Sequence, residues 1–198
     1  MRSALVVVDV QESFRQRSSW EAVSDPDVAD KVNRLVRAAR DSGDLVVWVL
    51  HAEPGTGNVF DPARGHVRLM DGLADPGDEP VLVKTVHNAF TTTDLQQRLD
   101  EQGIRHVVVC GIRTEQCCET TARLASDLGY DVTFVVDATA TMPIEHPEAP
   151  EGRTVAEVLA DPRTLSADAV IERTVYALAG RFATVRTVEE MTAAVAAG

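Results

Sequence analysis

The feature that most constrains the fold is an alternation between short apolar runs and longer segments with helical spacing. The apolar runs are rich in β-branched residues and cover positions 4–10, 45–50, 81–83, 106–110, 132–136 and, more weakly, 183–185. Between most of these runs, apolar residues recur every three or four positions, as in 28–39, 95–99 and 122–128. Buried strands joined by helices form a parallel sheet that is covered on both faces. The sequence therefore predicts a three-layer α/β fold.

Composition limits the class of protein and its partners. With 198 residues, 44% of them hydrophobic, the chain can build one substantial core, so we expect a single domain over residues 1–198. The formal net charge of −12 argues against nucleic acid or an anionic membrane surface as a partner. The first residues lack a signal-peptide pattern, no run of about 18 apolar residues is present, and the three cysteines form no spaced disulfide framework. We expect a soluble, cytoplasmic protein.

Two long segments interrupt the alternation of strands and helices. Residues 53–80 contain five glycines and four prolines, and residues 142–162 contain four prolines. We expect both to be long loops with at most one short helix each. Loops of this length often form the walls or lid of a binding site, and contacts between subunits are an equally good interpretation.

Two charged residues stand at the ends of predicted strands, where the ligand crevice of an open α/β sheet lies. Asp9 falls at the end of an apolar strand, where a buried carboxylate needs a partner, although it could simply cap the following loop. Lys84 ends another buried run, although its side chain could also extend to the rim of the sheet. The coincidence of the two makes them candidates for a functional pair.

Cys117 is the candidate nucleophile. The segment that contains it reads as a strand, a tight turn at Gly111 and a helix that begins near Cys117. A thiol at a helix N-terminus is expected to have a lowered pKa, and the free N–H groups there could hold an oxyanion. Cys110, within the strand, and Cys118, one step into the helix, fit the usual role of buried packing residues.

Three motifs together resemble those of a known family. Residues 7–14 read VVDVQESF, residues 84–90 read KTVHNAF, and residues 111–122 read GIRTEQCCETTA. In this order they resemble the isochorismatase-like cysteine hydrolases, a family that includes nicotinamidases, N-carbamoyl amidases and isochorismatase itself. The resemblance extends from about residue 4 to residue 138 and implies an isochorismatase-like (Rossmann-like) fold with a six-stranded parallel sheet. It also implies a homodimer or homotetramer.

The resemblance further implies a catalytic site. Asp9, Lys84 and Cys117 would converge at the strand ends. A cis peptide between Ile112 and Arg113 would direct the backbone amides of Arg113 and Cys117 into an oxyanion hole. In such a site Asp9 accepts the thiol proton, Lys84 stabilises the anions, and Cys117 attacks a carbonyl carbon.

We therefore expect an enzyme that cleaves a C–N bond of a small amide, ureido or lactam substrate and needs no cofactor. Candidate substrate-binding residues lie in or near the motifs and the second strand, although each aromatic among them is equally compatible with the core: Gln11, Phe14, Trp48, His51, Phe60, His87, Asn88 and Phe90.

Other functions stay open at this point. The family can also cleave a vinyl ether by acid chemistry at the aspartate, without a thiol. A non-catalytic module that binds a nucleotide has little support, because no Gly-x-Gly-x-x-Gly or P-loop follows any predicted strand. A non-catalytic interaction subunit would have no reason to keep Asp9, Lys84 and Cys117. Labelling of a low-pKa thiol that depends on Asp9 and Lys84 would favour the enzyme.

A metal site is not expected. The Asp-x-His pattern that nicotinamidases carry after the second strand is replaced by His51-Ala52-Glu53, and the spacing of His51, Asp61 and His66 fits no metal signature.

We therefore predict that activity does not depend on added metal, because the expected nucleophile is a thiol and not metal-bound water. Turnover should survive prolonged dialysis against a chelator. Loss of turnover that zinc or iron restores would show that a metal site exists and would favour a nicotinamidase.

Overall fold

The central sheet has six parallel strands in the order β3-β2-β1-β4-β5-β6. The computed structural model describes residues 2–193. The strands are β1 (Ser3–Val8), β2 (Leu45–His51), β3 (Val81–Lys84), β4 (His106–Ile112), β5 (Asp131–Ala140) and β6 (Thr184–Arg186). The chain builds outward from β1 to β3 and then from β4 to β6 on the other side, so the direction reverses between β1 and β4. Ligands of open α/β sheets bind at the carboxyl ends of the strands beside such a reversal.

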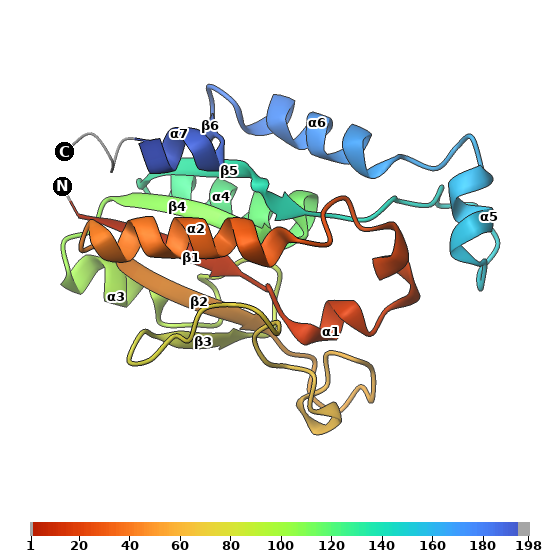
Figure 1. The fold of residues 1–198 in the computed structure, drawn as a ribbon, viewed down its shortest axis with the longest axis horizontal. Helices are drawn as coiled ribbons and strands as arrows, with labels where there is room; N and C mark the ends of the chain where they lie inside the picture. Colours follow the sequence, from red (N-terminus) through yellow and green to blue (C-terminus); the bar gives the residue numbers. More distant parts are fainter. Residues whose placement is uncertain (1, 194–198) are drawn as a thin grey trace.

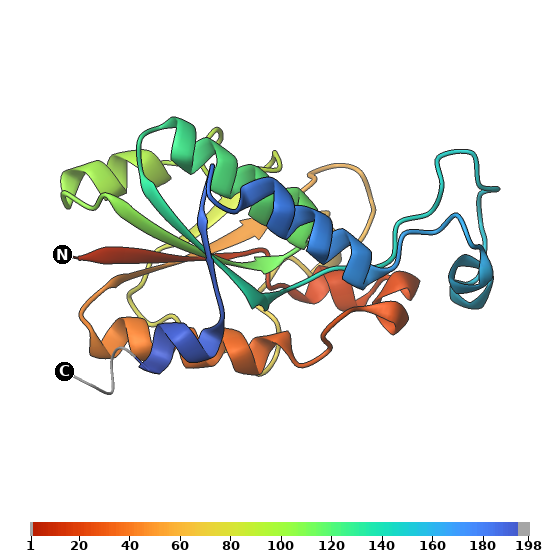
Figure 2. The same ribbon diagram turned by 90° about the horizontal axis from the view of Figure 1, so that it is seen from above.

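Helices cover both faces of the sheet, as the sequence predicted, and Figure 2 shows the three layers. One face carries α2 (Val28–Asp41) and α7 (Val188–Ala193), and the other carries α3 (Leu95–Glu101), α4 (Glu119–Asp127) and α6 (Ala167–Leu178). Strand side chains alternate between the two hydrophobic clusters that result. None of the helices in residues 2–193 is long and apolar enough to span a membrane.

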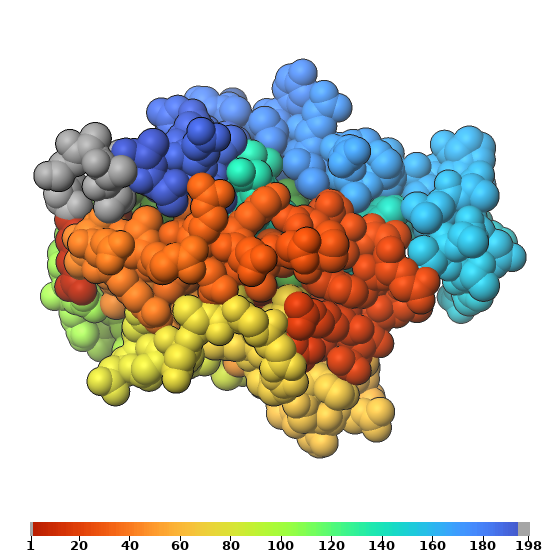
Figure 3. All heavy atoms as spheres, viewed as in Figure 1, coloured from red at the N-terminus to blue at the C-terminus, as the bar shows by residue number. Residues whose placement is uncertain are grey.

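Short helices and loops surround the carboxyl edge of the sheet (Figure 1). They include α1 (Glu12–Arg15), the 3-10 turns η1 (Ser18–Ala22) and η2 (Pro62–Arg64), and α5 (Val155–Ala160). Both long segments are loops with one short helical element each, as predicted. Backbone bonds fasten the first loop to the end of β1, since the Met70 N–H donates to the Val10 carbonyl at 3.0 Å. The segment around α5 stands out at one end of the molecule (Figure 3).

A close approach between β1 and β4 fixes the geometry of the carboxyl edge. Gly111 pairs with Val8 and has a φ of 129°, in a region that L side chains rarely adopt. A Cβ at this position would lie 1.9 Å from the Val8 carbonyl oxygen, so only glycine fits. The glycine thus brings the turn that follows β4 against the end of β1.

We predict that Gly111→Ala lowers the free energy of unfolding by more than about 3 kcal/mol, because backbone would have to move to relieve the clash. Gly129→Ala is the matched control, since Gly129 has a φ of 88° but nothing within 4 Å of its Cβ position. It should cost only about 1–2 kcal/mol, the strain of the left-handed conformation. Urea denaturation measures both, and equal losses would contradict the steric argument.

Candidate active site

Asp9 lies directly after β1 in an uncommon backbone conformation. Its φ is 53°, in the left-handed region that non-glycine residues seldom occupy and that persists only where the surrounding structure enforces it. The Asp9 N–H donates to the Val49 carbonyl at 2.8 Å, and the Asp9 carbonyl accepts from the Gln11 N–H at 2.9 Å. The side chain is completely buried. The end of β1 therefore holds a carboxylate inside the protein, where it needs a charged partner.

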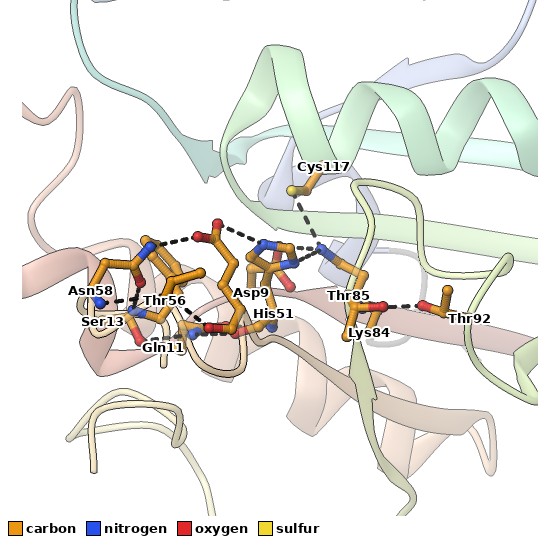
Figure 4. Close-up of polar contacts among 12 residues, drawn as sticks. Asp9, Gln11, Ser13, His51, Thr56, Asn58, Lys84, Thr85, Thr92 and Cys117 are labelled. Carbon is orange, nitrogen blue, oxygen red and sulfur yellow. Dashed lines mark hydrogen bonds and ion pairs between the residues drawn. The ribbon is translucent and has the colours of Figure 1, made fainter. Parts of the chain in front are cut away.

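Lys84 supplies that partner. It is the last residue of β3, it pairs with His51 of β2, and its side chain is completely buried. The ammonium Nζ lies 2.7 Å from Asp9 Oδ2, 3.4 Å from Cys117 Sγ and 3.4 Å from His51 Nδ1. Figure 4 shows the ammonium between these groups. The convergence of Asp9, Lys84 and Cys117 is the arrangement that the sequence motifs predicted.

Cys117 lies in a π-helical turn, Thr114–Cys118, that precedes α4. The turn closes through a bond from the Cys118 N–H to the Arg113 carbonyl at 3.1 Å. The predicted helix near Cys117 is present, but it opens with this π-helical turn, and regular α-helix begins only at Glu119, two residues after Cys117. Single π-turns in helices are frequent at functional sites. Cys117 is 7% exposed, whereas Cys118 is completely buried in the core, as the sequence predicted.

The resting site holds a protonated thiol. Burial raises the pKa of Cys117, the Asp9 carboxylate raises it further, and the Lys84 ammonium opposes both. The lowered thiol pKa expected from a helix N-terminus was therefore wrong, because desolvation and a neighbouring carboxylate outweigh the lysine. Burial also raises the pKa of Asp9, against the opposing effect of Lys84. In this geometry Lys84 and Asp9 form an ion pair at 2.7 Å beside a thiol whose pKa is raised.

Two polar groups of the site, one acceptor and one donor, have no hydrogen-bond partner among the described residues and could contact a substrate or accept a proton. Asp9 Oδ1 is buried and accepts no hydrogen bond within residues 2–193. The peptide between Ile112 and Arg113 is cis, as the resemblance implied, and the Arg113 N–H donates no hydrogen bond in the same part of the chain.

The guanidinium of Arg113 is occupied elsewhere. It forms an ion pair with Glu115 at 3.0 Å and donates to the Thr141 hydroxyl and the Met142 carbonyl. The backbone N–H of Arg113 takes no part in these contacts and is therefore a candidate donor to an anionic oxygen.

Three of the predicted pocket residues contact one another, and one of them, His51, contacts Lys84. The Phe60 ring lies 5.7 Å from the His51 ring and 5.1 Å from the Phe14 ring, measured between centroids. Gln11 is a further predicted pocket residue, but its side-chain amide is occupied. It accepts from the His51 N–H at 2.7 Å and donates to the His51 carbonyl at 3.0 Å, so it fixes the end of β2.

The remaining predicted pocket residues lie elsewhere. Trp48 is completely buried under α2, and its indole N–H donates to Glu79 at 2.7 Å. Phe90 stacks on Tyr130 in the opposite cluster. The prediction that Trp48 lines the pocket is corrected by this position, because its side chain is completely buried in the core. Phe90 lies in the same hydrophobic cluster as Cys117, and its place in the pocket stays a prediction.

The last two predicted pocket residues, Asn88 and His87, lie in the β3–α3 loop. Asn88 accepts hydrogen bonds from the Phe90 and Thr91 N–H groups and so stabilises its own turn. His87 is exposed to solvent in the same loop.

Sequence reasoning missed Glu53 and Asn58. The His51 ring nitrogen Nε2 lies 3.2 Å from Glu53 Oε1, and Asn58 Nδ2 donates to Glu53 Oε2 at 2.6 Å. Only the His-x-Glu spacing at the end of β2 could have drawn attention to this pair.

The three residues considered as metal ligands, His51, Asp61 and His66, do not form a metal site in this structure. No group of three or more His, Cys, Asp or Glu side chains surrounds a common point within residues 2–193. Asp61 instead accepts from the Gly57 and Ala63 N–H groups and caps η2. The ring nitrogens of His51 already form hydrogen bonds with Lys84 and Glu53.

The fold and the site define an α/β protein with a buried thiol at the carboxyl edge of its sheet. Residues 3–190 match the family model described as "Isochorismatase domain", so the chain belongs to the isochorismatase family of hydrolases. It is 28% identical over 190 residues to the uncharacterized isochorismatase family protein YddQ of Bacillus subtilis, and the match covers 96% of this chain and 98% of YddQ.

Relatives with more specific names are similar over shorter lengths. The chain is 30% identical over 172 residues to ureidoacrylate amidohydrolase RutB of Klebsiella pneumoniae, covering 70% of this chain and 73% of that protein. It is 31% identical over 157 residues to a protein of Arabidopsis thaliana named "Probable inactive nicotinamidase", covering 70% and 80%. The solved structure of a cysteine hydrolase from Pseudomonas syringae superposes with a TM-score of 0.81 at 24% identity, covering 99% and 93%, and shows the same fold.

The two charges beside the thiol should change its reactivity in opposite directions. Asp9→Asn removes the charge that raises the pKa of Cys117, so alkylation by iodoacetamide at pH 7 should become faster. Lys84→Met removes the opposing ammonium, so alkylation should become slower. In the unchanged protein the rate should keep rising with pH above 9, because the raised thiol pKa lies above that range. Peptide mass mapping locates the label.

Cys118→Val is the control, because Cys118 is completely buried in the core. It should leave the pH dependence of alkylation unchanged and should cost little stability. A label that appears first on Cys118, or Asp9 and Lys84 variants that shift the rate in the same direction, would refute this account of the site.

Proposed function

We propose that this protein is a cysteine hydrolase that cleaves a C–N bond of a small amide, ureido or lactam substrate through a thioester intermediate. The observation that carries the proposal is the position of the Lys84 ammonium, which lies within hydrogen-bonding distance of both the Asp9 carboxylate and the Cys117 sulfur. A nucleophile, a base and a positive charge within reach of one another are what nucleophilic catalysis of acyl transfer needs.

The first half-reaction uses the free oxygen of Asp9. Asp9 Oδ1 takes the thiol proton as Cys117 Sγ attacks the carbonyl carbon of the substrate, and Lys84 stabilises the sulfur as it becomes negative. The backbone N–H groups of Arg113 and Cys117 hold the oxyanion. The C–N bond then breaks, and the leaving nitrogen takes the proton from Asp9. The product that remains is a thioester on Cys117.

The second half-reaction reverses these roles. Asp9 removes a proton from water, the water oxygen attacks the thioester carbonyl, and the same N–H groups hold the second oxyanion. The C–S bond breaks, and the proton returns from Asp9 to the Cys117 sulfur. The enzyme ends in its resting state, with a neutral thiol beside the ion pair.

The relatives support C–N cleavage, and one of them supports an alternative. The chain resembles ureidoacrylate amidohydrolase, whose name states hydrolysis of an amide-type bond. A thiol nucleophile suits this reaction, whereas vinyl-ether cleavage by acid chemistry would not use it. The similarity to a protein named "Probable inactive nicotinamidase" favours a non-catalytic alternative, in which the site binds a small molecule without turnover.

A screen with matched variants tests the proposal. Primary amides, carbamoyl compounds and lactams are incubated with the protein, and release of ammonia or amine is measured. We expect turnover of at least one class, a loss of more than about 1,000-fold in Cys117→Ala, and a comparable loss in Asp9→Asn. Turnover that persists in Cys117→Ala would refute the mechanism. Binding without turnover of any class would favour the non-catalytic alternative.

A further inference from the structure

The buried ammonium of Lys84 has three hydrogen-bond partners, and the proposed mechanism uses only two of them. Asp9 Oδ2 and Cys117 Sγ take part in the reaction, whereas the third partner, His51 Nδ1 at 3.4 Å, does not. An ammonium carries three protons, so these three acceptors account for all of them. Because Lys84 is completely buried, each partner bears on the direction in which the ammonium points.

The position of the His51 ring determines which of its nitrogens carries the proton. Nδ1 faces an ammonium, which can only donate, so Nδ1 must be the acceptor. The proton of the neutral ring then resides on Nε2, which lies 3.2 Å from Glu53 Oε1 and donates to it. The other Glu53 oxygen accepts from Asn58 at 2.6 Å, which holds the carboxylate in place. A chain of hydrogen bonds thus runs from the loop after β2 to the ammonium.

We propose that His51 is a positioning residue for Lys84, and that Glu53 makes it one by holding the ring proton on Nε2. The inference rests on the proposed function of Cys117. With its third proton on His51, the ammonium can direct one N–H at the Cys117 sulfur and one at Asp9. Without that acceptor, the ammonium has a buried, unsatisfied donor and can satisfy it only by turning away from the sulfur.

The charges around His51 favour this arrangement over simple packing. Lys84 faces Nδ1, Glu53 faces Nε2, and Arg17 lies over the neighbouring Phe60 ring, 5.5 Å from its centroid. Asp9 also contacts the ammonium, at 2.7 Å. A proton on Nδ1 would face the ammonium, whereas a proton on Nε2 lies against a carboxylate. The hydrogen bond from Asn58 lowers the pKa of Glu53, with help from His51, and so keeps that carboxylate ionised.

The backbone of His51 is held independently of its ring. Gln11 accepts from the His51 N–H and donates to the His51 carbonyl, so substitutions of the ring leave the end of β2 in place. A side chain of similar reach can therefore replace the acceptor alone. The amide oxygen of asparagine can occupy the place of Nδ1, whereas leucine fills the space without an acceptor.

Two measurements that need no substrate test the inference. The ¹⁵N chemical shifts of the His51 ring identify the tautomer, and we expect a protonated Nε2 and an unprotonated Nδ1. The pH profile of Cys117 alkylation by iodoacetamide reports the contact from Lys84 to the sulfur. His51→Leu should slow alkylation about tenfold at a given pH, the effect of one ordinary hydrogen bond, and His51→Asn should restore the rate to within about twofold.

Glu53 provides the second matched pair. Glu53→Gln keeps an acceptor for Nε2 and should leave the tautomer unchanged, whereas Glu53→Leu should allow a population protonated on Nδ1 and should slow alkylation. Thermal unfolding of each variant verifies that it folds. If His51→Leu does not fold, the ¹⁵N shifts of the unchanged protein and the comparison of Glu53→Gln with Glu53→Leu still test the inference.

Three outcomes would overturn the inference. They are a ring protonated on Nδ1 in the unchanged protein, equal alkylation in His51→Leu and the unchanged protein, and equal losses in His51→Leu and His51→Asn. None of them depends on turnover, so failure of this inference is distinct from failure of the proposed function, which Cys117→Ala tests.

Discussion

The contact on which the site depends is the ion pair between Lys84 and Asp9. Both side chains are completely buried, and the two atoms lie 2.7 Å apart. Removing either charge from water costs several kcal/mol, so each is tolerated only because the other is present. Such a pair contributes little to net stability, and a well-packed apolar pair would often serve the fold as well or better. Its presence at the carboxyl edge of the sheet is therefore better explained by chemistry than by folding.

The topology of the sheet brings this pair to the thiol. Asp9 and Lys84 come from strands on either side of β2, so the lysine side chain reaches across the end of β2 to the carboxylate. Gly111 lets β4 approach the β1 backbone more closely than any other residue would, and the turn after it carries Cys117 to the ammonium. Four neighbouring strands, β3, β2, β1 and β4, therefore each contribute a position to a site only a few ångströms across, and a parallel sheet is what places their ends at one edge.

Much of this could be predicted from the sequence, because the signals were periodic or occurred in motifs. Runs of β-branched residues located all six strands, and motif spacing selected Asp9, Lys84 and Cys117. The sequence did not indicate how far a strand residue lies from the carboxyl edge of the sheet. Trp48 looked like a pocket residue, but alternation along a strand indicates a face of the sheet and does not show how far from the edge a side chain lies. The contact between His51 and Glu53 was missed because it joins a strand end to an aperiodic loop.

The raised thiol pKa follows from the same burial and changes how the nucleophile is activated. A preformed thiolate would place two anions, sulfur and carboxylate, beside one ammonium in a site from which water is excluded, and desolvation disfavours this. Moving the proton from Cys117 to Asp9 avoids the difficulty, because the cluster keeps one negative and one positive charge throughout. The ammonium already contacts both groups, so the ion pair passes from the carboxylate to the sulfur without either charge leaving its partner. In the proposed mechanism, burial therefore favours transfer of the thiol proton during attack over ionisation of the thiol beforehand.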